Sequence, residues 1–112
     1  MKLVLPKDRP MSWNTLYSGS HWSHRKFEAE RVHYLVREAI GYDPIMFKNP
    51  VDIAVSAYFD TRPLDPDNIS SKFYIDGMKG LLISDDNYKF INSVTTRSKV
   101  DKDNPRVEIE IY

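Results

Sequence analysis

The sequence predicts a single α+β domain, with one mixed sheet and two packed helices in the order β-α-β-α-β-β. Its 112 residues, 41% of them hydrophobic, suffice for one core, so we expect residues 1–112 to form one domain. Apolar residues recur at helical spacing in one segment and alternate at period two in others. No cysteine, internal repeat or Gly/Ser-rich linker cross-links or divides the chain.

The first half of the chain is expected to contain a short strand, a loop and the longer helix. Residues 2–5 form the strand, and residues 6–23, rich in proline and serine, form the loop. The helix extends from Ser23 to about Ile40, because its apolar residues follow a three-to-four spacing. Ser23 is a suitable N-cap and Gly41 a suitable stop.

A strand and a short helix follow. Val51–Phe59 alternates in side-chain direction with apolar residues on one side, which predicts a strand with one buried face. The helix is expected from Ile69 to about Lys79, with Asp67 or Asn68 as its cap and Gly80 at its end. The proline- and aspartate-rich stretch between the two elements indicates a turn.

Two more strands complete the predicted sheet. They span Lys89–Arg97 and Arg106–Ile111. In the second, the valine and the isoleucines point to one side and the glutamates to the other. The polar segment Ser98–Pro105 is typical of a hairpin connection, so we expect these two strands to form a hairpin.

Charge is unevenly distributed along the chain. The formal net charge of zero, from 16 Lys+Arg and 16 Asp+Glu, argues only weakly against nucleic-acid binding. Residues 1–40 carry seven basic and four acidic side chains, a net +3, and residues 41–112 carry nine and twelve, a net −3. Four of those twelve acids lie in two short clusters. If the clusters hold divalent cations, the surface that a partner meets is effectively basic.

No feature of the sequence indicates a membrane protein. The N-terminal apolar run Leu3–Leu5 is too short for a signal peptide or an anchor. No other stretch approaches the roughly 20 apolar residues of a membrane helix. We therefore expect a cytoplasmic protein.

The residues best suited to chemistry are acidic. Asp65 and Asp67 follow a buried strand and flank Pro66, so both carboxylates can project to the same side. Asp85 and Asp86 open the following strand. If that strand pairs beside the earlier one, its first residues should lie near the last residues of its neighbour. We therefore expect the carboxylates to converge at one edge of the sheet.

Converging carboxylates require a positive charge among them. The two candidates are a hard divalent cation with oxygen ligands and Lys72, in the first turns of the short helix. Such a site suits phosphodiester hydrolysis, because a carboxylate-bound Mg²⁺ polarises the phosphoryl oxygen and acidifies the attacking water. Lys72 would add positive charge against the developing phosphorane or orient the water.

Taken together, these residues resemble the RusA-type family of Holliday junction resolvases, endonucleases found largely in bacteria, prophages and phages. The family pattern is D-x-D-N, then a lysine and an aspartate along the next helix, then an aspartate pair that opens the following strand. The matching residues here are Asp65, Asp67, Asn68, Lys72, Asp76, Asp85 and Asp86. The segment Pro10–Tyr17 is similar to a proline-serine-asparagine-tyrosine stretch of the family. In one departure, Lys72 follows Asp67 by five positions, against four in the best-known member.

The resemblance implies a RusA-like fold and a homodimer that resolves four-way DNA junctions in recombination and repair, in a bacterial or phage-infected cell. Its paired symmetric incisions would depend on Mg²⁺, with Mn²⁺ as a substitute. The implied catalytic residues are Asp65, Asp67, Asp86 and Lys72, the three aspartates being the metal ligands. The implied supporting residues are Asn68, Asp76 and Asp85.

Other features leave two alternative functions open. Arg25, Lys26 and Arg62 are the residues expected to contact DNA phosphates. Because Asp-Pro and Asp-Asn are turn formers in themselves, the chain could be a non-catalytic module that binds branched or duplex DNA. It could also be a nuclease that acts on another structured nucleic acid. His21 and His24 lie three positions apart, but the absence of cysteine disfavours a zinc site.

Overall fold

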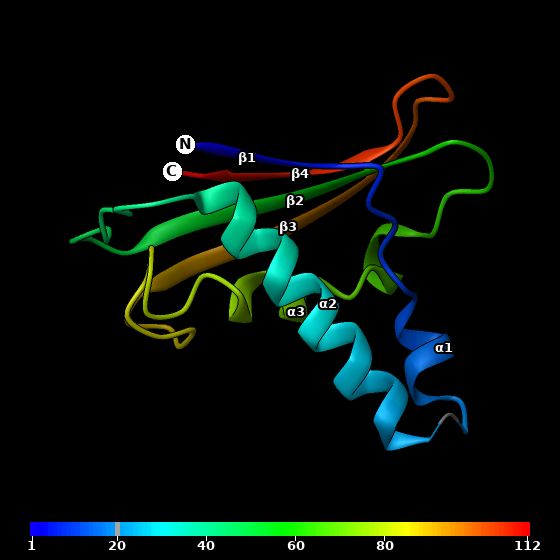
Figure 1. Cartoon of the computed structure of the whole chain (residues 1–112), viewed down its shortest axis with the longest axis horizontal. Helices are drawn as coiled ribbons and strands as arrows, with labels where there is room; N and C mark the ends of the chain where they lie inside the picture. Colours follow the sequence, from blue (N-terminus) through cyan, green and yellow to red (C-terminus); the bar gives the residue numbers. More distant parts are fainter. Residues whose placement is uncertain (20) are drawn as a thin grey trace.

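A four-stranded mixed sheet forms the centre of the molecule (Figure 1). The computed structural model describes residues 1–19 and 21–112. The strands are β1 (Lys2–Pro6), β2 (Val51–Phe59), β3 (Ile91–Val100) and β4 (Arg106–Ile111). Their order is β1-β4-β2-β3; β4 runs antiparallel to both neighbours, whereas β2 and β3 are parallel. The predicted α+β class with one mixed sheet is confirmed.

β2 is an inner strand of the sheet, hydrogen-bonded to β4 along one edge and to β3 along the other. Val55 and Ala57 are buried on one face, and Ala54 and Ser56 are buried on the other. The expectation that only one face of this strand is buried is therefore wrong, because the small side chains of Ala54 and Ser56 are covered as well. The expected hairpin through residues 98–105 is also wrong, because β3 and β4 lie on opposite sides of β2.

The bounds of the strands agree closely with the sequence pattern. β2 and β4 span the predicted residues, and β1 is one residue longer. β3 begins at Ile91 rather than Lys89 and continues to Val100. The reason is a turn at its start, in which the Phe90 N–H donates to the Asn87 carbonyl at 3.0 Å. The sheet ladder begins only after that turn.

The segment expected to be a loop contains a short helix, α1 (Trp13–Tyr17). Ser12 caps it, because its Oγ accepts a hydrogen bond from a first-turn N–H at 3.0 Å. Five residues are too few to show a helical period in the sequence. The long helix α2 (Trp22–Ile40) begins earlier than expected, with its N-cap two residues before the predicted cap Ser23. Its cap is His21, whose Nδ1 accepts from the Ser23 N–H at 3.2 Å.

The second predicted helix is shorter than expected. Pro66–Asn68 forms a 3₁₀ turn, η1, and α3 spans only Ser71–Asp76. Asp67 therefore belongs to η1, and Ser70 precedes α3 without a side-chain cap bond. Gly80, expected at the helix end, lies beyond it in a separate turn with a φ of 79°, which favours glycine.

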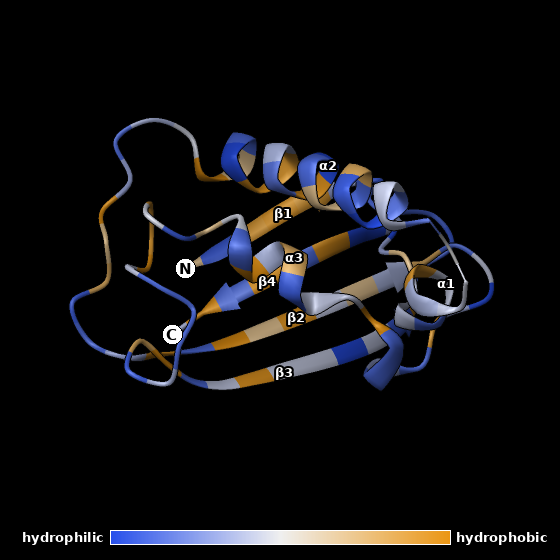
Figure 2. Ribbon diagram, turned by 90° about the horizontal axis from the view of Figure 1, so that it is seen from below, coloured by the Kyte–Doolittle hydropathy of each residue, from blue (hydrophilic) through white to orange (hydrophobic). Residues whose placement is uncertain are grey.

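α2 and α3 lie on the same face of the sheet (Figures 1 and 2). Val32 and Val36 of α2 and residues 73–75 of α3 enter the core. Gly77, which directly follows α3, lies close to α2: an added Cβ would be 3.0 Å from the Val36 Cβ. No helix in the described part of the chain combines the length and hydropathy needed to cross a bilayer.

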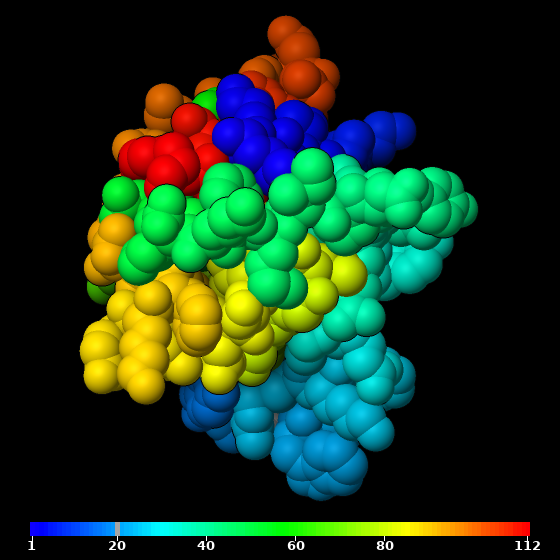
Figure 3. Space-filling view, turned by 90° about the vertical axis from the view of Figure 1, so that its left-hand side faces the viewer, coloured from blue at the N-terminus to red at the C-terminus, as the bar shows by residue number. Residues whose placement is uncertain are grey.

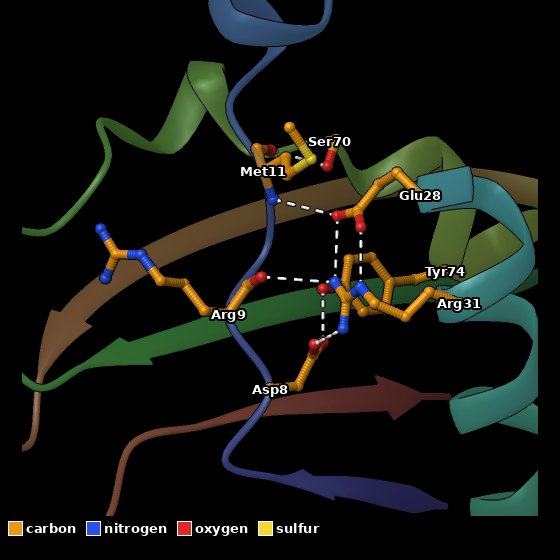
Figure 4. A network of polar contacts seen from close by, with 7 residues as sticks. All are labelled: Asp8, Arg9, Met11, Glu28, Arg31, Ser70 and Tyr74. Carbon is orange, nitrogen blue, oxygen red and sulfur yellow. Dashed lines mark hydrogen bonds and ion pairs between the residues drawn. The ribbon is translucent and has the colours of Figure 1, made fainter. Parts of the chain in front are cut away.

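A buried polar network ties the segment after β1 to the helices (Figure 4). Arg31 donates to Asp8 Oδ1 at 2.5 Å and to the two Glu28 oxygens at 2.7 and 3.0 Å. The Tyr74 hydroxyl donates to Asp8 Oδ2 at 2.6 Å. Hydrogen bonding to Glu28 raises the pKa of Arg31, and burial raises that of Tyr74. The network satisfies two carboxylates that would be very costly to bury unpaired.

The face that carries both chain ends also carries the loop that leads into β3 (Figure 3). Residues 41–50 cross this face between the ends and that loop. The Phe47 N–H donates to the Leu82 carbonyl at 2.8 Å, and Ser84 Oγ contacts Met46 Sδ at 3.1 Å. The connection from α2 to β2 thus contacts Leu82 and Ser84, which precede the residues of the candidate site.

Candidate active site

Two lysines and three aspartates meet where α3 faces the loop before β3. Lys72 Nζ lies 3.4 Å from Asp76 Oδ2 and 3.7 Å from Asp86 Oδ2. Lys79 Nζ lies 3.6 Å from Asp85 Oδ1 and 3.7 Å from Asp86 Oδ1. We call these five residues the lysine–aspartate cluster. Asp86 is the member that both lysines contact.

Four of the predicted site residues are therefore brought together, and Lys79 is the member that the sequence analysis missed. A signal for Lys79 was present. It lies seven positions after Lys72, and two helical turns place such residues on the same face. The helix ends at Asp76, yet the following turn still directs Lys79 toward the aspartates.

Local sequence explains how the cluster is held. Lys72 and Asp76 lie one turn apart in α3, a spacing that favours an ion pair. Asp85 Oδ1 accepts a hydrogen bond from the Asp86 N–H at 2.8 Å. Asn87 Oδ1 accepts from the Lys89 N–H at 2.9 Å. These bonds from side chain to backbone hold the loop in tight turns, and its ion pairs with Lys72 and Lys79 place it beside α3 and the turn that follows α3.

The charges in the cluster stabilise one another. Partial desolvation would raise the pKa of Asp86, but hydrogen bonding with Asp76 and Asp85 and attraction to both lysines outweigh it and lower that pKa. Attraction to Asp76 raises the pKa of Lys72 despite some desolvation. At neutral pH Lys72 is therefore an ammonium group and Asp86 a carboxylate. Lys72 is suited to stabilising negative charge rather than to accepting a proton.

Two buried polar atoms, one in the cluster and one on α2, lack hydrogen-bond partners in the described part of the chain. Asp76 Oδ1 and His33 Nε2 are both buried without a hydrogen-bond partner among the described residues. Burial lowers the pKa of His33, and the negative charge of Asp76 opposes this effect. Buried polar atoms without partners cost free energy. These two atoms therefore lower the stability of the contact between α2, which carries His33, and α3, which carries Asp76.

Asp65 and Asp67 lie outside the cluster. Asp65 precedes η1 and Asp67 is part of it. Leu64, just before them, accepts a hydrogen bond from the Ser98 hydroxyl near the end of β3. Asp86, in contrast, precedes the first residue of β3. Asp85 and Asp86 therefore lie before the first residue of β3, whereas Asp65 and Asp67 follow a residue that contacts β3 near its end.

The direction of β3 explains this separation. The parallel register pairs Val51 with Ile91 and Phe59 with Val100. The first residues of β3 consequently lie beside the first residues of β2. The expectation that they lie near the last residues of β2 is wrong. It would hold for an antiparallel pair, and strand direction is set by the crossover through α3 rather than by the strand's own sequence.

Residues 1–19 and 21–112 contain no group of three or more histidine, cysteine or acidic side chains positioned to hold a metal ion. Carboxylates are suitable donors for Mg²⁺, but Asp86 is paired with two lysines. The expected convergence of Asp65, Asp67 and Asp86 on one ion is therefore not found.

Asn68 contacts the N-terminal segment instead of the cluster. Its Oδ1 accepts a hydrogen bond from the Asn14 N–H at 3.0 Å. Next to it, Ser12 and Ile69 form an isolated antiparallel bridge. The segment Pro10–Tyr17 and the residues that follow Asp67 are therefore packed against each other, although about 50 positions separate them in the sequence.

The three basic residues expected to contact DNA lie apart from the cluster. Arg25 donates to the Leu16 carbonyl at 3.2 Å, and its guanidinium carbon lies 4.8 Å from the Tyr17 ring centroid. Lys26 is exposed in the first turns of α2, and Arg62 is exposed in the loop after β2. Within the described chain, none of the three forms an ion pair with a cluster residue.

An open pocket of about 400 Å³ adjoins the lysine–aspartate cluster. Lys72 and Asp86 line it on one side, and residues 91–94 at the start of β3 line it on another. The Lys72 side chain is 61% exposed, so its ammonium group is accessible to a ligand from solvent.

The chain matches a known protein family over most of its length. A family model described as "Endodeoxyribonuclease RusA" matches residues 23–112. The matched range includes every member of the lysine–aspartate cluster and begins after the segment Pro10–Tyr17. Searches of curated proteins and of solved structures found no significant match.

Proposed function

The chain belongs to the RusA endodeoxyribonuclease family, and on this premise we propose that it resolves four-way DNA junctions by paired, symmetric, Mg²⁺-dependent incisions. Membership makes the chain a nuclease and implies activity on Holliday junctions. The metal requirement, the symmetry of the cuts and the residues responsible are the parts that we propose.

The contact between Lys72 and Asp86 carries this proposal. Both residues belong to the family pattern, and they lie 14 positions apart in the sequence. Their charged groups are 3.7 Å apart, beside an open pocket. If the aspartates served only to form turns, neither this contact nor the pairing of Asp86 with two lysines would be required.

Lys72 acts as an electrostatic catalyst. Its ammonium group lies at the edge of the pocket, where a non-bridging oxygen of the scissile phosphate can approach it. Negative charge develops on the phosphoryl oxygens in the transition state, and a preorganised cation stabilises that state more than the ground state. Asp76 and Asp86 hold the ammonium group in place.

We propose that the Mg²⁺ requirement, with Mn²⁺ as a substitute, depends on Asp65, Asp67 and Asp86. Since the structure holds Asp65 and Asp67 apart from Asp86, one ion shared by all three carboxylates would require these segments to approach each other. A bound divalent ion supplies Lewis-acid polarisation and an activated water in phosphodiester hydrolysis. Because Asp86 is paired with Lys72 and Lys79, an ion would compete with both lysines for this carboxylate. Asp85 supports the site by contacting Lys79.

The active form is a homodimer that works on DNA in the cytoplasm of a bacterial or phage-infected cell. A junction with matching arms is nearly two-fold symmetric. Two incisions related by that symmetry require two active sites with the same relation, and a C2 dimer provides them.

The proposal is tested with Asp67→Asn and a labelled synthetic four-way junction. We expect the variant to bind the junction but to lose Mg²⁺-dependent nicking, because the amide keeps the shape of the side chain and removes its charge. Asp103→Asn is the matched control, since Asp103 is exposed in the connection between β3 and β4; it should cut like the parent protein.

Two results would count against the proposal. Substantial nicking by Asp67→Asn would remove Asp67 from the catalytic set. Equal cutting of junction, flap, duplex and single-stranded DNA would instead indicate a nuclease without selectivity for the four-way branch.

A further inference from the structure

The pocket beside the lysine–aspartate cluster combines features that suit a nucleotide. Its volume of about 400 Å³ falls within the range of pockets that hold small ligands, roughly 300–1,000 Å³. Ile75 and Ile91, which line it, are only 7% and 8% exposed and provide an apolar floor. Lys72 and Asp86 provide charge at the side. The apolar floor can contact the flat face of a nucleobase, and the lysine beside it can contact the phosphate of the same nucleotide.

Tyr88 provides an aromatic surface at this pocket. It follows Asp86 by two positions, lines the pocket, and is 82% exposed. Its ring has no aromatic, cationic or hydrogen-bonding partner among the described residues. Exposing a ring of this size to water is unfavourable, and every nucleobase offers a flat face on which such a ring can stack.

Asn92 provides an unoccupied amide in the same pocket. Its side chain makes no hydrogen bond within the described part of the chain. The neighbouring polar groups are already engaged: Asn87 accepts from the Lys89 N–H at 2.9 Å, and the Ser93 hydroxyl donates to Asp52 at 2.5 Å. The Asn92 amide can therefore donate to and accept from the edge of a base.

We infer that this pocket binds one unstacked nucleotide of the strand that is cut. Tyr88 stacks on its base, Asn92 contacts the edge of the base, and Lys72 contacts the adjoining phosphate. The inference rests on the proposed function, because it requires the scissile strand to lie at Lys72. Unstacking a base costs least where the stack is already interrupted, as it is at a branch. The pocket thereby favours a junction over an intact duplex.

The test uses the full-length protein and a four-way junction that carries 2-aminopurine next to the branch point, without divalent metal so that no strand is cut. The fluorescence of 2-aminopurine reports the stacking of that base. We expect the parent protein to change the fluorescence. Tyr88→Ala should abolish the change and weaken junction binding roughly 10-fold, the loss of one base–aromatic contact. Its affinity for duplex DNA should remain unchanged.

Two further variants serve as controls. Tyr88→Phe keeps the ring and should restore both the fluorescence change and the affinity. Tyr42→Ala removes a tyrosine that is 101% exposed and lies outside the pocket, so it should behave like the parent protein. Because Tyr88 is exposed, thermal unfolding of its variants should match that of the parent.

The outcomes separate this inference from the proposed function. Unchanged junction affinity of Tyr88→Ala, or an equal loss on junction and duplex, overturns the inference. Cleavage in Mg²⁺ is measured in parallel. If the parent protein cuts while Tyr88→Ala binds normally, the inference fails and the proposed function stands. If the parent protein does not cut, but Tyr88→Ala still loses the fluorescence change and junction affinity, the pocket binds a nucleotide and the proposed function fails.

Discussion

Among single residues, Lys72 is expected to affect cleavage through its positive charge. Lys72→Ala removes a positive charge that lies 3.7 Å from Asp86. We expect the single-turnover rate of junction cleavage to fall about 100-fold, the usual effect of losing one preorganised electrostatic contact, at nearly unchanged junction affinity. Lys102→Ala, exposed in the connection between β3 and β4, is the control. An unchanged rate in Lys72→Ala would leave Lys72 with a structural role only.

His33 should make the stability of the fold depend on pH. Burial lowers its pKa in the folded protein below the ordinary value of 6.5. As the pH falls through 6.5, the unfolded chain binds a proton that the folded protein does not, so the free energy of unfolding decreases. Chemical unfolding at about pH 7.5 and about pH 5.5 measures this loss.

His33→Gln should reduce that pH dependence, because glutamine does not titrate. His24→Gln, exposed on the same helix, should leave it unchanged. If the two variants and the parent lose stability equally on acidification, His33 is not the residue responsible.

At this scale the sequence identified most of the cluster but not its full composition. Lys72, Asp76 and Asp86 could be predicted because they match a family pattern in order and type. The position of Lys79 in the cluster depends on the turn after α3, and the family pattern includes no residue of that turn. Whether Asp65 and Asp86 lie close together depends on the direction of β3 relative to β2, and no individual residue determines that direction.

Among the elements, the segment after β1 depends on Arg31 of α2. Arg31→Met keeps the length of the side chain but leaves Asp8 and Glu28 buried without their cationic partner; their side chains are only 0% and 3% exposed. We expect a loss of about 2–4 kcal/mol in the free energy of unfolding. Arg37→Ala, on the exposed side of α2, should cost less than about 0.5 kcal/mol. Denaturant unfolding of both variants checks this, and equal losses would contradict a special role for the network.

The elements themselves were predicted with uneven success, for physical reasons. β2 and β4 carry apolar residues at every second position and were located to the residue. α1 was missed because five residues capped by Ser12 show no period. The predicted hairpin of β3 and β4 was wrong because each of these strands pairs with a different edge of β2, and that pairing is a contact between segments distant in the sequence.

For the whole molecule, the proposed paired incisions require two copies of the chain. One chain has a mass of 13.1 kDa, so light scattering should give about 26 kDa, twice that value, for the junction-cutting species. Dilution to a concentration at which the dimer dissociates should lower the specific activity. Full activity of a 13.1 kDa species would show that one copy suffices.

The charge distribution also acts at this scale. The net charge of zero conceals a basic N-terminal third and an acidic remainder. The structure places two lysines among the clustered acids, so part of that acidic charge is already neutralised without a metal ion. A polyanionic partner therefore meets less repulsion at the cluster than the count of aspartates suggests.

We propose that this chain cuts branched DNA in a metal-dependent reaction to which Lys72 contributes its positive charge. The most direct measurement incubates the purified protein with an end-labelled four-way junction and with a duplex of the same sequence, each with and without Mg²⁺, and maps the ends produced. We predict two symmetrically placed nicks in the junction with Mg²⁺, none without it, and an intact duplex. No cleavage with any divalent metal, or equal cleavage of junction and duplex, would contradict the claim.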